Sequence, residues 1–175
     1  MFSGRLVDYK KIPLLIHAVE ILSRNEGSVH LTVLGDGPEL DQLKELTKTL
    51  NLTQVVSFPG GQYGEGARPY FQKADLLVLP SAAGLSIIHA LSYGLPVITS
   101  DEMKRHGPEI EALTPEANGS FFEKDNVVDL SEKLANWGMR LQNSRTEIAE
   151  QCMSSIGDYR PENVYLKFKD AIKSR

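Results

Sequence analysis

Residues 76–101 read LLVLPSAAGLSIIHALSYGLPVITSD, and this stretch decides the fold. A short apolar run passes through a turn of small residues into a helical pattern, and a Gly-Leu-Pro turn leads to a second apolar run. This order is typical of a βαβ unit, whose two strands lie parallel. The first turn holds nothing larger than alanine between Ser81 and Gly84. It leaves backbone N–H groups open at a helix N-terminus, where the macrodipole favours an anion such as a diphosphate.

The rest of the chain repeats this alternation, which predicts an α/β fold with a doubly wound parallel sheet and helices on both faces. Pro13 and Pro38 are expected at the first positions of two helices, and the glycine-rich segment 62–69 is expected to be a loop. Strands are predicted at 2–6, 29–34, 55–58, 76–79 and from 97, with an edge strand near 118–122; further helices are predicted at 70–74, 108–113 and 127–141, with a polar helical pattern after 143.

Composition narrows the function classes. A chain of 175 residues is long enough for one domain with a core of its own. Its net charge of -4 and pI of about 5.6 argue against nucleic-acid binding. Cys152 is the one cysteine, which is typical of a reducing, cytoplasmic setting. No apolar run or leader pattern indicates membrane insertion or export. Because the sequence opens inside a predicted strand, we expect a piece of a longer chain.

Basic residues follow the first predicted strand. Arg5, Lys10 and Lys11 are expected at the carboxyl edge of the sheet, where doubly wound folds bind ligands. Arginine makes bidentate contacts with phosphate, and lysine offers a point charge. Taken alone, these residues fit a solvated loop better than a phosphate site.

His89 lies on the helix of the βαβ unit, roughly 7 Å along its axis from Gly84 at about 1.5 Å per residue. That separation suits a contact with the ribose of a nucleotide whose diphosphate lies at Gly84, although a purely structural histidine fits equally well. No histidine, cysteine or carboxylate set has the spacing of a metal site, so no metal is expected. No nucleophile or acid pair stands out either, which indicates a domain that holds a ligand rather than attacks it.

An ordered series of motifs resembles the C-terminal domain of family 4 glycosyltransferases over nearly the whole chain. The series is specific through its order and distances rather than through any one motif. It comprises Gly4-Arg5-Leu6 with Lys10, Gly35-Asp36-Gly37-Pro38, Ala74-Asp75 with Leu79-Pro80-Ser81, Gly84-Leu85 with His89-Ala90, Gly94-Leu95-Pro96-Val97-Ile98, Gly107-Pro108-Glu109 and Asn118-Gly119.

The resemblance implies the GT-B fold, in which two Rossmann-like domains face each other across a cleft and the C-terminal one binds a nucleotide-sugar. It also implies a retaining reaction without a metal or a cofactor, the substrate being a nucleotide-sugar, with a UDP-sugar expected. The implied site consists of Arg5, Lys10 and the backbone of Gly84, Leu85 and Ser86 for the donor diphosphate, His89 for the ribose, and Pro59 and Gly60 for the base.

One departure concerns two glutamates that the family usually carries with seven residues between them. His89 stands at the second position and keeps the capacity to hydrogen-bond a ribose hydroxyl. Ser81 stands at the position of the first glutamate, counted back from His89. The first glutamate therefore has no counterpart here, which leaves open how the donor sugar is bound. The His89-Ala90 pair resembles that of a bacterial subgroup of the family, which makes cell-surface polysaccharides.

These features predict the donor-binding half of an enzyme that moves a hexose or N-acetylhexosamine to a glycan or lipid-linked acceptor in O-antigen, lipopolysaccharide or capsule synthesis. Residues 1–157 are expected to form the Rossmann-like domain, and 158–175 a helix returning toward an N-terminal acceptor domain, without which the piece is inactive. Basic residues of that helix fit a solvated face, with contact at the inner face of the cytoplasmic membrane as the alternative. The other functional alternatives are a non-catalytic interaction module and a sugar-nucleotide epimerase half-domain.

Overall fold

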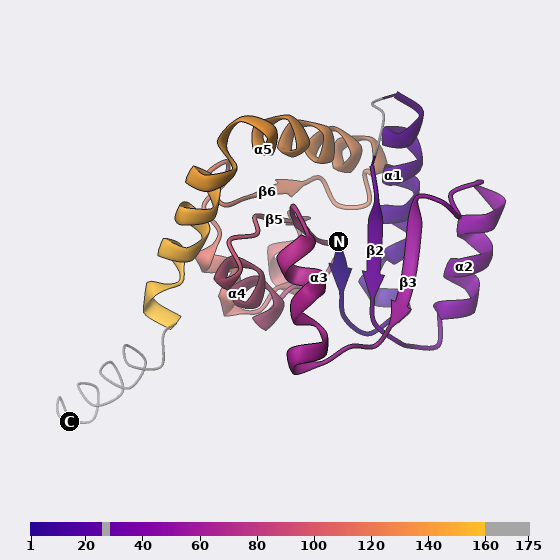
Figure 1. Cartoon of the computed structure of the whole chain (residues 1–175), viewed down its shortest axis with the longest axis horizontal. Helices are drawn as coiled ribbons and strands as arrows, with labels where there is room; N and C mark the ends of the chain where they lie inside the picture. Colours follow the sequence, from indigo (N-terminus) through magenta and orange to yellow (C-terminus); the bar gives the residue numbers. More distant parts are fainter. Residues whose placement is uncertain (26–28, 160–175) are drawn as a thin grey trace.

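The computed structural model describes residues 1–25 and 29–159, in which six short strands alternate with helices (Figure 1). The strands are β1 (Phe2–Ser3), β2 (Leu31–Leu34), β3 (Val56–Gly60), β4 (Leu77–Leu79), β5 (Val97–Ser100) and β6 (Gly119–Phe122). The α-helices are α1 (Ile12–Asn25), α2 (Leu40–Thr49), α3 (Arg68–Lys73), α4 (Leu85–Ser92) and α5 (Val127–Ser155). Single 3₁₀ turns are η1 (Asp8–Lys10), η2 (Gly64–Gly66), η3 (Met103–Arg105), η4 (Pro108–Ala112) and η5 (Gly157–Tyr159).

All strand pairs are parallel and form two three-stranded sheets, β1-β2-β3 and β4-β5-β6. Met1 joins them. Its amino group donates to the carbonyl of Leu76 at 2.7 Å, and its carbonyl accepts from the N–H of Val78 at 2.8 Å. The strands therefore follow the order 3-2-1-4-5-6, which is that of a doubly wound dinucleotide-binding sheet. The expected fold class is confirmed.

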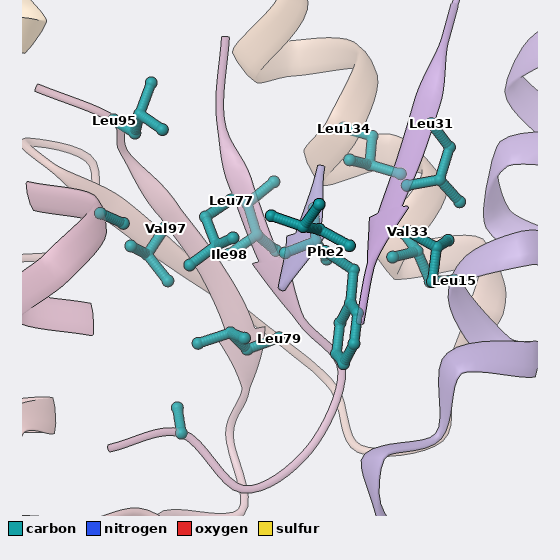
Figure 2. Packing of buried hydrophobic residues seen from close by; sticks show 14 of the residues in the cluster. Phe2, Leu15, Leu31, Val33, Leu77, Leu79, Leu95, Val97, Ile98 and Leu134 are labelled. Carbon is teal, nitrogen blue, oxygen red and sulfur yellow. The ribbon is translucent and has the colours of Figure 1, made fainter. Parts of the chain in front are cut away.

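The core forms because the central strands are apolar on both faces. Every residue of β4 and β5 is buried, as parallel strands covered by helices require. In Figure 1, α5 lies on one side of β5 and β6, and α4 lies on the other. Figure 2 shows Phe2 of β1 among strand residues of both three-stranded sheets, with Leu15 of α1 and Leu134 of α5 in the same cluster.

Several boundaries differ from those predicted. Strand β1 ends at Ser3 rather than at residue 6, because Gly4 has a φ of +154°, which departs from strand geometry. Helix α2 begins at Leu40, so Pro38 lies in the preceding turn. Helix α3 begins at Arg68, inside the segment predicted to be a loop, and α1 begins one residue before Pro13.

The predicted helix from Val127 is confirmed and extends further. Asn126 caps it through its side-chain oxygen, which accepts from the N–H groups of Val128 and Asp129. Ser144 breaks the helical geometry with a φ of -135°, so α5 is two helices joined at a kink. Its predicted apolar side packs on the core and comprises Leu130, Leu134, Trp137 and Leu141.

The predicted last helix, with its apolar and basic residues, falls on residues from 160 onward, which lie outside the described part of the chain. The division at 157/158 therefore remains a prediction. Among residues 1–25 and 29–159, no helix combines the length and apolar character that crossing a bilayer requires.

Candidate functional site

The loops that follow the strands meet at the carboxyl edge of the sheet, and Lys10 joins two of them. It stands at the end of η1, and its ammonium group donates to the carbonyl of Ala82 at 2.6 Å. Ala82 belongs to the turn that leads into α4. Burial lowers the pKa of Lys10 from its usual value of 10.5. The predicted cation thus lies beside the predicted anion-binding turn.

Helix α4 begins without a side-chain cap. Gly84 is its N-cap residue, with φ -152° and ψ -128°, and no side chain accepts a hydrogen bond from the first turn. Leu85 is 76% exposed and Ser86 is half-buried. This uncapped helix start begins two residues after Ala82, whose carbonyl the Lys10 ammonium contacts, and this arrangement suits an anion.

Arg5 lies between β1 and η1, five positions before Lys10 at the end of η1. Its side chain is exposed, and no described residue pairs with its guanidinium. Lys11 differs from its neighbour, because its ammonium forms an ion pair with Asp125 in the turn before α5. Of the three basic residues considered in the sequence, Lys10 is thus the one whose ammonium contacts the turn before α4, while Lys11 contacts the turn before α5.

His89 is part of an aromatic cluster on α3 and α4. Its ring centroid lies 4.3 Å from that of Phe71 and 5.3 Å from that of Tyr93. The side chain remains exposed, but partial burial lowers its pKa from the usual 6.5. A neutral imidazole carries one donor and one acceptor, both of which a sugar hydroxyl can use.

Pro59 and Gly60 end β3 at the same edge of the sheet. The carbonyl of Gly60 accepts from the N–H of Gly35 at 3.0 Å, and the Asp36 carboxylate accepts from the N–H of Gly61 at 2.7 Å. The turn after β2 thus holds the segment expected to meet the base.

The glycines of that turn are required by close backbone contacts. A Cβ on Gly35 would lie 1.8 Å from the carbonyl oxygen of Gly4, and one on Gly37 would lie 2.2 Å from that of Leu6. The motif therefore closes the loop after β1 onto the loop after β2. These tertiary contacts give the motif a packing role beyond that of a turn into a helix.

Two polar residues at this edge, His106 and Glu109, were not among the predicted site residues, although Glu109 belongs to the Gly107-Pro108-Glu109 motif. Between η3 and η4, His106 contacts both Ala83 and Ser100 through its ring nitrogens. The carboxylate of Glu109 lies beside two glycines, since Oε2 is 2.3 Å from a Cβ placed on Gly107 and 3.6 Å from one placed on Gly84. The sequence feature that could have identified them is the polar stretch directly after β5, since it follows the carboxyl end of a central strand.

A hollow lies elsewhere, at the amino ends of β2 and β4. It measures about 720 Å³ and lies between α1, α3 and α5, with Leu31, Leu76 and Arg145 in its lining. We favour the carboxyl edge as the ligand site, because open α/β sheets bind ligands outside the carboxyl ends of their strands. The described part of the chain holds no group of three or more His, Cys, Asp or Glu side chains that could bind a metal ion.

Comparison with known proteins agrees with this architecture. Residues 1–152 match the family described as glycosyl transferases group 1. An uncharacterized glycosyltransferase of Methanocaldococcus jannaschii is 28% identical over 162 residues, which cover 86% of this chain and 40% of the relative. The lipopolysaccharide core biosynthesis glycosyltransferase LpsE of Rhizobium meliloti is 33% identical over 112 residues, which cover 62% of this chain and 30% of the relative.

A solved structure extends the likeness to the fold. The crystal structure of Anabaena HepE in complex with UDP superposes with a TM-score of 0.81 at 19% identity, covering 99% of this chain and 48% of that one. This chain spans less than half the length of each of these three proteins. The resemblance drawn from the motifs is confirmed: the chain belongs to the glycosyl transferases group 1 family.

Proposed function

We propose that this chain is the donor-binding part of a retaining glycosyltransferase, which moves a hexose or N-acetylhexosamine from a nucleotide-sugar, with UDP as the nucleotide. The acceptor is a glycan or a lipid-linked saccharide of surface polysaccharide synthesis. One observation carries the proposal: the Lys10 ammonium lies 2.6 Å from the Ala82 carbonyl, beside the uncapped start of α4. The UDP complex of HepE and the name of LpsE support the choice of nucleotide and of pathway class.

In this proposal, positive side chains and the helix dipole bind the diphosphate and stabilise it as the leaving group. Lys10, Arg5 and the N–H groups of Leu85 and Ser86 hold the diphosphate and stabilise the charge that develops on the departing nucleotide. Such preorganised donors are worth most where charge appears in the transition state. His89 in its neutral form bonds the ribose, and the backbone at Pro59 and Gly60 meets the base.

The proposal leaves one role to be filled by other parts of the enzyme. No acid, base or nucleophile is assigned in this chain, so transfer requires the acceptor domain that we expect to precede it. The proposed division is a donor-binding unit at 1–157 and a helix at 158–175 that returns to that domain. The proposed place of action is the cytoplasm, with peripheral contact at the inner face of the membrane, where lipid-linked acceptors are found.

Titration of the 175-residue chain with UDP, GDP and ADP by calorimetry tests the proposal. We expect UDP to bind, and Arg5→Ala and Lys10→Ala to weaken it by at least about tenfold each, since a hydrogen bond to a charged group contributes about 1.5–3 kcal/mol. His89→Ala should weaken it by about two- to tenfold, since a hydrogen bond between neutral groups contributes about 0.5–1.5 kcal/mol. Arg24→Ala is a matched control, because Arg24 is exposed on α1 and pairs with Glu20 on the same helix.

The outcome also separates the alternatives. Selective binding of GDP or ADP would replace UDP as the nucleotide and keep the site. Failure of all three nucleotides to bind would contradict the donor-binding proposal for this chain and favour the interaction module. Conversion of a UDP-sugar to its epimer without any acceptor, in the protein with its preceding domain, would favour the epimerase.

A further inference from the structure

We infer that His106 is a positioning residue: it fixes the turn 81–84 and, through that turn, the N-terminal N–H groups of α4. The inference deepens the proposed function and rests on it for the ligand. It stands on a set of hydrogen bonds that link the segment after β5 to the turn after β4.

The two ring nitrogens of His106 contact two different backbone groups. Nε2 lies 2.9 Å from the carbonyl oxygen of Ser100, which can only accept, so Nε2 carries the hydrogen. Nδ1 lies 3.2 Å from the backbone nitrogen of Ala83, whose N–H can only donate, so Nδ1 offers its lone pair. One state satisfies both contacts, namely the neutral imidazole protonated at Nε2.

The neighbouring peptide strengthens this link. The N–H of Gly107 donates to the carbonyl of Ala83 at 2.7 Å, so both backbone polar groups of Ala83 bond to the 106–107 segment. Ala83 itself is 4% exposed, and an unpaired N–H at such a position costs about 1–3 kcal/mol. The histidine therefore anchors a buried point of the turn to the end of β5.

The rest of the turn is held from other sides. Thr99 of β5 donates to the carbonyl of Ser81 at 3.3 Å, and Lys10 donates to that of Ala82 at 2.6 Å. Among these side chains, His106 is the one that accepts a hydrogen bond from the turn, whereas Thr99 and Lys10 donate. Because Gly84 follows directly and caps α4 without any side-chain bond, the direction of the first N–H groups of α4 depends on how this turn is held.

This arrangement is preorganisation for an anion. The turn need not be ordered when a diphosphate arrives, so the ordering cost is met by folding rather than by binding. Removal of the Nδ1 acceptor is therefore expected to weaken UDP binding without removing any group that touches UDP.

Three substitutions separate the two ring contacts. In His106→Asn, the side-chain oxygen stands near the place of Nδ1 and still accepts from Ala83, but the reach to Ser100 is lost. In His106→Gln, the terminal amide reaches Ser100 and leaves the Ala83 N–H unpaired. His106→Ala loses both contacts, and His30→Ala is the control, since His30 is exposed and lies at the amino end of β2.

We expect His106→Asn and His30→Ala to bind UDP within about threefold of the unmodified chain, and His106→Gln and His106→Ala to bind about tenfold more weakly. Free energies of unfolding, measured by urea titration, should fall by similar amounts in His106→Asn and His106→Gln. A purely structural role would make UDP affinity follow stability, and equal affinity in these two variants would overturn the inference.

A second readout needs no ligand. Hydrogen exchange of the Ala83 amide should be as slow in His106→Asn as in the unmodified chain, and at least tenfold faster in His106→Gln and His106→Ala. If the unmodified chain fails to bind UDP, the proposed function fails while this exchange still decides whether His106 holds the turn. Unchanged exchange in His106→Ala would refute the anchoring itself.

Discussion

Gly94, in the turn between α4 and β5, is expected to tolerate no side chain. Its φ is +72°, and a Cβ there would lie 2.8 Å from the Cβ of Ala149 on α5. Carbon atoms normally pack at about 3.5–4.0 Å, so Gly94→Ala forces an overlap of roughly 1 Å. Left-handed backbone costs an alanine about 1–2 kcal/mol, and overpacking adds about 1–3 kcal/mol. We expect the free energy of unfolding to fall by about 2–5 kcal/mol, which lowers Tm by roughly 4–20 °C at this size.

A double-mutant cycle separates the two costs. Ala149→Gly removes the atom that collides and by itself costs about 1 kcal/mol, as a glycine within a helix does. In the double variant, the loss should be smaller than the sum of the single losses by about 1–3 kcal/mol, which is the overpacking part. Urea titration followed by circular dichroism measures all four proteins.

The control for this prediction is Gly138→Ala on α5. Gly138 is exposed, and a Cβ there meets nothing within 4 Å. That change should raise the free energy of unfolding by about 0.5–1 kcal/mol, because alanine favours helix more than glycine does. A Gly94→Ala variant as stable as the unmodified chain, or a cycle with purely additive losses, would refute the packing described here.

Three further predictions concern titratable side chains. Burial raises the pKa of the Cys152 thiol to about 12, so a disulfide reagent should label it only across the unfolding transition, and labelling in the native state would contradict its burial. Burial lowers the pKa of His89 from 6.5, so the unfolded chain takes up more protons on acidification; the free energy of unfolding should fall as the pH is lowered through 6.5, less steeply in His89→Gln, and equal slopes in urea titrations would count against this. Glu109 holds negative charge beside Gly84, so Glu109→Gln should tighten UDP binding about threefold by calorimetry, whereas weaker binding would mean that the carboxylate assists the ligand.

The sequence predicted what depends on local pattern. Apolar runs around Val78 and Val97 and the small-residue turn before Gly84 are local signals, and they located the βαβ unit and its uncapped helix. Strand β1 was overestimated because Leu6 is apolar and buried but belongs to a turn that packs under the loop after β2. Its burial comes from tertiary contacts that a run of apolar residues does not distinguish from a strand.

The candidate site was predictable where topology alone brings residues together, because the loops that follow parallel strands meet at one edge of the sheet. Lys10 was expected near the turn before α4, and its contact with Ala82 spans 72 positions in the chain. His106 was missed, and the partner of Lys11 was not predicted, because each depends on an individual side-chain contact rather than on the general position of a loop. Ala83 for His106 and Asp125 for Lys11 are chosen by the fold, and no spacing in the sequence signals either contact.

The hydrogen bonds of Met1 to the β4 segment have a consequence for the order in which the protein assembles. Strands β1, β2 and β3 come from the first 60 residues and can pair with one another as soon as these have been synthesised. The other edge of β1 finds its partner at Leu76, 75 positions later in the chain. During synthesis, that central edge is open to solvent and to other chains until the β4 segment has left the ribosome. The same βαβ unit that supplies the candidate anion site therefore also closes the sheet.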